Sequence, residues 1–468
     1  YCRGPERKEQ IRARYGFRPE RAAAVLERLG NALIEENGLY YHAKRYDRAV
    51  RATVMAKRQE IRTQPSARYA ALMARTAFGR GDGKSRLREA LERYEDRALP
   101  AAWWEEIVFP ARSNGYQPAW LDAALAEGEL YWQLSPEGEL RFLKAEETDW
   151  DADDGWLEEG RQRCDTEEER LVYEELIRRG ASFLRPLSAC LKGESAQEPL
   201  LALAQKGLVC ADSFVPVRQW LNREKLAKAP VRQRVGARVM ALSSGRWDLV
   251  RPTKPFRPER WLEKLLSEHF ILCRETFRKP SFDPENAQDG RAFSWADALR
   301  ILGVWEYAGK VRRGYFVEGL SGAQFVRAED YGAVMQALAA PEPEICWLNA
   351  ADPAQVWGKC LPHEEGRAFA NVPFTAVALK EGRPVALLER KGRILRALEE
   401  ESPERPSAES ARGDIWEEAL LQLAEAFRSG RLFPSLKRLV VKEYPDFAAD
   451  AWKKAGFRRE MQDYVLYR

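Results

Sequence analysis

The sequence predicts an α+β protein built from tandem winged-helix domains and ending in a small C-terminal β-barrel or α+β domain. The first observation is a repeated pattern, in which an apolar helix ends near a glycine and continues into a short hairpin. The second is a change after Pro341, where short strands separated by glycine turns follow one another. A hydrophobic content of 45%, with 15 Trp and 19 Phe, is ample for packed cores.

The repeated pattern occurs four times at irregular spacing, which indicates a tandem array of related units rather than a solenoid. The four copies read VLERLGNALIEENGLYY, LDAALAEGELYWQL, LLALAQKGLVCADSFV and LRILGVWEYAGKVRRGYFV. The first copy lies in residues 1–43, which we expect to form a partial winged helix. Its Asn37-Gly38 dipeptide is typical of tight hairpin turns. Because the chain begins with Tyr rather than Met, we expect a fragment whose first unit lacks its opening residues.

Residues 44–148 are expected to hold a helical segment and a second winged helix, with a recognition-type helix at Pro118–Ala126. Residues 149–220 are expected to form a third winged helix, whose wing is the hairpin Leu208–Val215. The acidic stretch Glu146–Glu169 between them is typical of a solvated linker, and we expect it to face away from any nucleic acid.

Residues 221–258 are expected to be a basic connector. From residue 218 to residue 260, twelve basic residues face only three acidic ones, and proline and glycine are frequent. Such a segment suits contacts to phosphates, and an aromatic side chain beside an arginine suits stacking on a base. The candidate nucleic-acid contacts in it are Arg232, Arg234, Arg238, Arg246 and Trp247.

Residues 259–340 are expected to form the fourth winged helix, in which Leu299–Val326 supplies the end of a helix, a tight turn and a two-stranded wing. Arg312, Arg313 and Tyr315 lie at the base of that wing, where a nucleic-acid backbone would run. As the fourth copy of the unit, downstream of the basic connector, this wing is the candidate nucleic-acid-facing element.

Residues 341–468 are expected to form the C-terminal β-rich domain. Its short strands are expected at Ile345–Asn349, Phe374–Lys380, Pro384–Glu389, Gly392–Ala397, Leu436–Lys442 and Tyr464–Tyr467. A helix is expected at Ile415–Ser429. Consecutive short strands of this kind favour a small sheet or barrel.

Net charge does not identify a partner, because 76 basic residues nearly balance 72 acidic ones. The seven cysteines are scattered without a CxxC pair, and the three histidines lie far apart, which argues against structural zinc and a disulfide framework. No apolar run approaches the roughly 20 residues of a membrane span, and no signal peptide opens the chain. We therefore expect a reduced, cytoplasmic protein that does not enter a membrane.

Four segments carry a family resemblance. They are FPARSNGYQPAWLDAALAEGELYW (Phe109–Trp132), VRRGYFVEGLSGAQFV (Val311–Val326), NAADPAQVWGKCLP (Asn349–Pro362) and WKKAGFRR (Trp452–Arg459). With these segments in this order, the chain resembles the C-terminal region of bacterial Lhr (large helicase-related) proteins. In that family the region follows a superfamily 2 helicase core, and forms tandem winged helices with a β-barrel. It is also similar in fold to AlkZ-type DNA glycosylases, and glycosylase activity on uracil in DNA has been attributed to the family.

The resemblance implies a role in DNA repair, with DNA or RNA as ligand and an upstream helicase core in the same polypeptide. The chain contains no Walker A, DEAD or DExH motif. We therefore expect ATP and Mg²⁺ to serve a helicase core outside this chain, and we expect no cofactor or metal within it.

Three functions remain open at this point. The first is nucleic-acid binding, with DNA as the favoured ligand, by the winged helices and the basic connector. The second is a DNA glycosylase acting on uracil or a damaged base, which needs a carboxylate or amide beside the sugar of a flipped nucleotide. Asp463 and Gln324 are the candidate catalytic residues for it. The third is an oligomerisation or scaffold region that forms a homo-oligomer.

Overall fold

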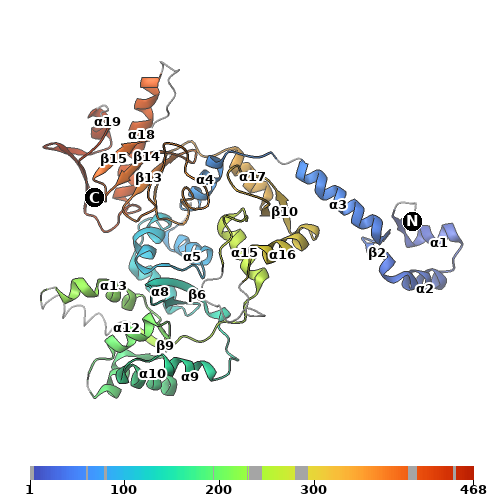
Figure 1. Ribbon diagram of the computed structural model, residues 1–468, viewed down its shortest axis with the longest axis horizontal. Coiled ribbons are helices and arrows are strands. Elements are labelled where there is room, and N and C mark those ends of the chain that lie inside the picture. Colours follow the sequence, from blue (N-terminus) through green and yellow to red (C-terminus); the bar gives the residue numbers. More distant parts are fainter. Residues whose placement is uncertain are drawn as a thin grey trace.

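The computed structural model describes residues 5–59, 62–78, 82–192, 194–228, 230, 245–279, 293–398, 408–445 and 449–468. Figure 1 shows a small N-terminal unit standing apart at one end of a long helix, with the remaining units gathered into a larger body. In the part of the chain that the structure describes, no helix is both long and apolar enough to span a membrane. No group of three or more His, Cys, Asp or Glu side chains in that part is arranged to hold a metal ion.

The N-terminal unit has the predicted order of helix, helix and hairpin. Its elements are β1 (Glu6–Arg7), α1 (Lys8–Tyr15), α2 (Pro19–Leu29), β2 (Leu33–Glu36), β3 (Leu39–His42) and the long helix α3 (Ala43–Gln59). The strands pair in the order β1-β3-β2. Asn37 and Gly38 both have positive φ, at 53° and 75°, as the tight hairpin turn requires.

The second unit carries the predicted helix before a hairpin wing. Its elements are α5 (Gly83–Arg93), β4 (Leu99–Pro100), α6 (Ala101–Trp103), a π-helical turn (Trp104–Val108), α7 (Phe109–Arg112), α8 (Pro118–Ala126), β5 (Leu130–Leu134) and β6 (Glu139–Lys144). The preceding helix α4 (Ser66–Arg75) packs in a separate core, against α17 (Tyr331–Ala339). The strands pair in the order β4-β6-β5, with Trp132 opposite Phe142. Pro118 occupies the first turn of α8, where a missing backbone N–H costs nothing.

The third unit differs from the prediction in the strand that completes its sheet. Its elements are α9 (Gly155–Gln162), α10 (Glu167–Arg179), β7 (Ser182–Phe183), α11 (Leu184–Ser188), α12 (Gln197–Gln205), β8 (Val209–Ala211), α13 (Val215–Ala227) and β9 (Arg246–Leu249). The sheet order is β7-β9-β8. The predicted local hairpin Leu208–Val215 is therefore wrong, because β8 pairs instead with β9, which lies beyond α13. Residues 246–249 belong to this unit and not to a connector.

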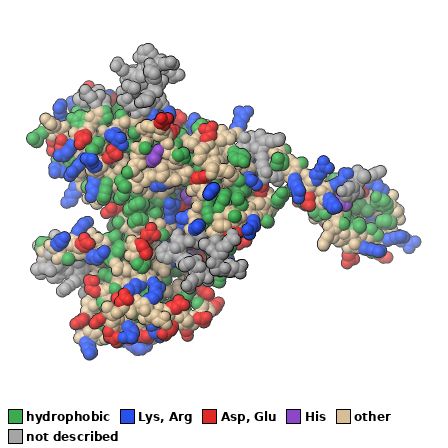
Figure 2. All heavy atoms as spheres, in the orientation of Figure 1, with side chains coloured by type: hydrophobic (Ala, Val, Ile, Leu, Met, Phe, Trp, Pro, Cys, Tyr) green, Lys and Arg blue, Asp and Glu red, His purple; other side chains and the backbone are tan. Residues whose placement is uncertain are grey.

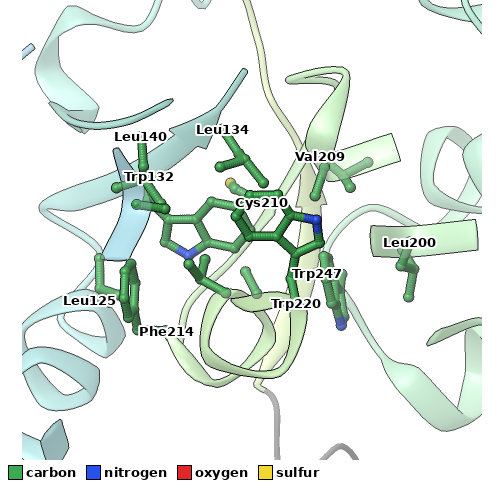
Figure 3. Packing of buried hydrophobic residues seen from close by; sticks show 14 of the residues in the cluster. Leu125, Trp132, Leu134, Leu140, Leu200, Val209, Cys210, Phe214, Trp220 and Trp247 are labelled. Carbon is green, nitrogen blue, oxygen red and sulfur yellow. The ribbon is translucent and has the colours of Figure 1, made fainter. Parts of the chain in front are cut away.

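Burial of Trp247 explains why the more distant strand is used. The Trp247 side chain is 1% exposed and meets Trp132 edge-to-face, with ring centroids 6.4 Å apart. Figure 3 shows these two tryptophans lying among Leu134, Val209 and Cys210, which come from both the second and the third unit. One continuous hydrophobic core thus joins the two units. Burying a large aromatic ring stabilises the fold more than a tight hairpin formed by the polar turn CADS at residues 210–213 would.

The acidic and basic stretches pair with each other at their near ends. Lys254 donates its backbone N–H to the Glu147 carbonyl (2.7 Å) and its Nζ to the Glu146 carbonyl (2.7 Å). Arg260 contacts the carboxylates of both Glu146 and Glu147. The Arg251 guanidinium lies 5.0 Å from the centre of the Trp150 ring. This end of the predicted connector is thus used for internal contacts with the acidic stretch.

The fourth unit contains the wing predicted from Leu299–Val326. Its elements are α15 (Pro258–His269), α16 (Trp295–Tyr307), β10 (Val311–Gly314), β11 (Gln324–Arg327) and α17 (Tyr331–Ala339). The strands β10 and β11 are antiparallel, with Arg313 opposite Phe325. The segment just after α3 adds to this wing, because the Gln64 N–H donates to the Phe316 carbonyl (2.8 Å) and the Gln64 carbonyl accepts from the Glu318 N–H (2.9 Å).

The C-terminal domain is α+β. Its elements are β12 (Cys346–Asn349), β13 (Ala376–Lys380), β14 (Arg383–Glu389), β15 (Ile394–Ala397), α18 (Ala408–Arg428), β16 (Arg438–Val441), α19 (Ala449–Lys454), β17 (Arg458–Glu460) and β18 (Asp463–Tyr467). The described strands form two sheets, β12-β13-β14-β15 and β16-β18-β17, and no closed barrel is found among them. Helix α18 packs in one core with both sheets, through Leu420, Leu423 and Phe427.

Candidate nucleic-acid interface

The predicted contacts on the fourth wing lie on different faces of it. Arg312 and Arg313 are neighbours on β10, and successive side chains on a strand point to opposite faces. The Arg312 guanidinium lies 4.1 Å from the centre of the Tyr331 ring, and that of Arg313 lies 5.7 Å from the centre of the Phe325 ring. Tyr315 is 63% exposed, and its carbonyl accepts a hydrogen bond from Thr63. The wing therefore offers one exposed aromatic ring and two half-buried cations, not a single basic patch.

Gln324 is fully buried and holds the turn of the wing. Its Oε1 accepts from the backbone N–H groups of Phe316 (2.7 Å) and Val317 (2.9 Å). Its Nε2 donates to the carbonyls of Val317 (2.8 Å) and Leu320 (3.1 Å). Both ends of the amide are thus occupied by backbone groups. This placement gives Gln324 a structural role in the wing, away from any open site.

The candidate contacts in the predicted connector also lie in different environments. Trp247 is buried in the core of the third unit, so its ring has no free face for stacking on a base. Arg246 is exposed and forms an ion pair with Asp212, with Nε 3.0 Å from Oδ2. Arg232, Arg234 and Arg238 lie outside the described residues.

Asp463 lines an open cleft of about 920 Å³ between the two sheets' ends in the C-terminal domain. It is the first residue of β18, and its Oδ2 lies 3.6 Å from the Lys442 ammonium. Six of the cleft's side chains are basic and two, Glu460 and Asp463, are acidic. The basic ones are Arg390, Lys391, Arg393, Lys437, Arg438 and Lys442. All six are exposed. Figure 2 shows Lys and Arg side chains gathered over this domain, and Asp and Glu side chains gathered over the third unit.

The turn between β14 and β15 holds three of these cations at the cleft. Arg390 and Lys391 have φ of 53° and 59°, values that residues other than glycine rarely adopt. The turn is tied to its neighbours, because the Lys391 N–H donates to the Phe374 carbonyl (3.0 Å) and the Arg393 carbonyl accepts from the Lys442 N–H (2.8 Å). The turn thus presents two bulky cations at the cleft in a backbone conformation that costs free energy.

Apolar groups also line the cleft. The Phe374 ring is 45% exposed and lies under the Lys391 ammonium, 4.1 Å from the ring centre to Nζ. Met461, between β17 and β18, is 95% exposed. A cation over an aromatic face, beside a second apolar side chain, suits the stacking of a nucleic-acid base. The cleft thus combines exposed cations, two apolar side chains and the carboxylate of Asp463.

Of the residues that line this cleft, the sequence predicts Asp463 as a candidate site residue and none of the others. Its lining comes from four separate segments, around residues 374, 390–393, 435–442 and 460–465. The signals present were the basic turn RKGR at 390–393 and the alternating run LKRLVVK at 436–442. The spacing of residues in the sequence does not show that these two segments lie side by side, because their contact depends on how the two sheets pack.

A second cleft of about 890 Å³ lies between the second and fourth units, and most of its charge is balanced. Its arginines include Arg86 and Arg327, which contact Glu89 and Asp330. Arg112 at its base is bonded to Asp352. The C-terminal cleft therefore carries the larger excess of exposed positive charge.

The fold and this cleft define a multidomain protein with two winged helices and an α+β domain that carries a basic cleft at its end. Residues 52–145 and 252–344 each match a family model described as large helicase-related protein, winged-helix domain. Two regions of the chain thus match winged-helix domains described for large helicase-related (Lhr) proteins, and the chain resembles an Lhr protein over most of its length.

Two curated relatives extend this likeness. The chain is 29% identical over 473 residues to the "Lhr helicase/ probable uracil glycosylase" of Mycolicibacterium smegmatis, covering 88% of this chain and 30% of that protein. It is 28% identical over 330 residues to the "Lhr helicase/uracil glycosylase" of Escherichia coli, covering 62% of this chain and 20% of that protein. The chain therefore spans less than a third of the length of either relative. Among solved structures, the Streptomyces sahachiroi DNA glycosylase AlkZ aligns with a TM-score of 0.41 and 14% identity, over 80% of this chain and 98% of that one.

Proposed function

We propose that this chain is the nucleic-acid-binding region of an Lhr-type DNA repair protein, with DNA as its ligand. The observation that carries this proposal is the C-terminal cleft, in which six exposed cations face two carboxylates. Only Lys442 among the six has an acidic partner within 4 Å in the described part of the chain. Exposed cations gain free energy on binding a phosphate backbone by releasing its counterions. The two winged-helix domains are a second support, since such domains commonly bind nucleic acid.

The test measures binding to a fluorescein-labelled DNA duplex by polarisation over a series of salt concentrations. The variant Arg390→Gln, Lys437→Gln, Arg438→Gln removes three cations from the cleft. We expect weaker binding and a shallower dependence of log K on log salt, by about 0.9 for each phosphate that is no longer neutralised. The control is Arg170→Gln, Arg178→Gln on α10, where both arginines already pair with glutamates of the same helix. An unchanged affinity and slope in the cleft variant would contradict the proposal.

A second candidate function is DNA glycosylase activity on uracil or a damaged base. Asp463 favours it, because this carboxylate lies inside a basic cleft that also holds apolar groups for a base. There it would activate water or stabilise the positive charge that develops on the sugar. The names of the two relatives describe a helicase and a uracil glycosylase, which supports looking for this activity here.

A uracil-containing duplex incubated with the chain and then treated with alkali tests this second function. Strand scission is expected with the natural sequence and is abolished in Asp463→Asn, which keeps the size of the side chain and removes its charge. Asp450→Asn on α19, an exposed acidic residue of the same domain, is the control and keeps the activity. No scission with the natural sequence would rule the activity out while leaving the binding function intact.

The names of these relatives also imply a motor in the whole protein. We propose that this chain acts beside a helicase core in the same polypeptide, which would use ATP and Mg²⁺. The chain itself would then hold DNA near the motor. Comparing strand separation by the whole protein with and without this region would test that role.

A further inference from the structure

Met461 forms the tip of the hairpin between β17 and β18. Its side chain is 95% exposed and its φ is 56°, a conformation for which turns ordinarily use Gly, Asn or Asp. An apolar, β-carbon-bearing residue here costs free energy twice, through its backbone conformation and through its contact with water. Met461 gains its interest from its place, because it lines the same cleft as the six exposed cations.

The hairpin that carries Met461 is rigidly supported at its base. Trp452 of α19 stacks on Tyr464 of β18, with ring centroids 4.3 Å apart and planes inclined by 4°. Tyr444 meets the Tyr464 ring edge-to-face and donates its hydroxyl to the Gln462 carbonyl (3.0 Å). Because the turn is anchored one residue beyond Met461, its backbone presents this side chain to solvent at the tip of the hairpin.

Met461 also borders the cleft that contains Asp463 and Phe374. Asp463 lies two residues further along the same hairpin and pairs with Glu460. The tip, the carboxylate and the exposed ring therefore surround one space, with cations around it. This is the arrangement required to hold a nucleotide that has left its stack beside a group that occupies the gap it leaves.

We propose that Met461 is a wedge that enters the base stack of a DNA duplex while one nucleotide turns into the cleft. This inference rests on the proposed DNA binding by the same cleft. Removing a base from the stack deprives both neighbours of their stacking partner, and an inserted apolar side chain replaces part of that stacking. Phe374 then provides the face against which the displaced base lies, and Lys391 and its neighbours contact the flanking phosphates.

The experiment uses a duplex with 2-aminopurine beside a U·G mismatch, because this base brightens when it loses its stacking neighbours. With the whole chain, we expect a several-fold rise in fluorescence on binding. Met461→Ala should lose most of that rise while its affinity, measured by polarisation, changes by no more than about threefold. Met461→Leu should retain the rise, since a similar apolar volume is kept. Leu171→Ala, which removes an exposed apolar side chain from α10 in the acidic third unit, is the control and should behave as the natural chain.

The possible results separate the wedge from binding itself. Tight binding without a rise in fluorescence would overturn the wedge and leave the DNA-binding function standing. A full rise with Met461→Ala would also overturn it, because the side chain would then be dispensable. Absence of DNA binding by the natural chain would overturn both.

Discussion

Arg112 and Asp352 form a bidentate ion pair in the interior of the molecule, although 240 positions separate them in the chain. Arg112 donates from Nη1 to Oδ2 (2.9 Å) and from Nη2 to Oδ1 (2.7 Å). Both side chains are buried, and Arg112 Nη2 also donates to the Tyr94 hydroxyl (2.7 Å). The pair links the end of α7 in the second unit to the loop after β12 in the C-terminal domain. The two parts of the body are thus joined by a buried charged contact.

Breaking this pair should destabilise the protein strongly. Asp352→Asn leaves the Arg112 charge buried and uncompensated, so we expect the free energy of unfolding in urea to fall by about 3–5 kcal/mol. The matched control is Glu417→Gln, which breaks the solvent-exposed pair with Lys454 (2.8 Å). That change should cost about 0–1 kcal/mol. Equal losses in the free energy of unfolding for the two substitutions would show that the buried pair stabilises the protein no more than the exposed pair does.

Gln324→Ala should act on stability rather than on chemistry. The change leaves four backbone groups of the wing turn without their partner, and each unsatisfied buried group costs about 1–3 kcal/mol. We expect a clear drop in melting temperature, with DNA binding and any uracil release unchanged well below that temperature. Gln336→Ala on the exposed side of α17 is the control and should shift stability by about 0.5 kcal/mol or less. Loss of uracil release in folded Gln324→Ala would restore Gln324 as a catalytic candidate.

His269 should make the protein less stable in acid. Burial, together with the nearby charges of Arg97, Arg278 and Arg93, lowers the pKa of His269 well below its usual 6.5. Its Nε2 also lies 3.5 Å from the Glu268 carboxylate, whose attraction does not outweigh burial and the three arginines. Below pH 6.5 the unfolded chain binds a proton that the folded chain does not, so stability falls as the pH decreases. The contribution of one such group is at most about 1.4 kcal/mol per pH unit.

The measurement for His269 compares urea unfolding of the natural chain and of His269→Gln at pH 8, 7, 6 and 5. At pH 8 the imidazole is neutral in both states, so the difference there reports packing alone. On going to pH 5, the variant should lose less stability than the natural chain. Parallel pH profiles would show that His269 titrates normally in the folded protein.

The two wing arginines should respond differently to alanine substitution. Arg312 lies close against Tyr331, so Arg312→Ala should lower stability by about 0.5–1 kcal/mol, because it removes the cation–π interaction. Arg313 is more distant from Phe325, and if the wing meets DNA, Arg313→Ala should reduce the salt dependence of binding by about one phosphate contact. Polarisation at several salt concentrations and urea unfolding measure the two effects. A larger loss of affinity in Arg312→Ala than in Arg313→Ala would reverse this assignment.

Elements whose hydrogen bonds close locally could be predicted from the sequence. The hairpin at Asn37-Gly38, the helix that begins at Pro118 and the wing around Val311–Val326 are all present in the structure. Each of these elements is determined by residues that are close together in the sequence. Backbone preference, apolar spacing and turn residues there all favour the same local structure. The last two of these elements lie in segments that carry the family resemblance, which already indicated the winged-helix domains.

Which distant segments meet depends instead on tertiary packing. The partner of β8 is β9, because burying Trp247 against Trp132 stabilises the sheet more than a local hairpin would. For the C-terminal domain the sequence left a small sheet or a barrel open, and the described strands form two sheets, because strand number alone does not determine whether a sheet closes. The cleft at Asp463 joins four segments, and the Arg112–Asp352 pair joins two domains. Such contacts follow from packing between elements, and no spacing within one element encodes them.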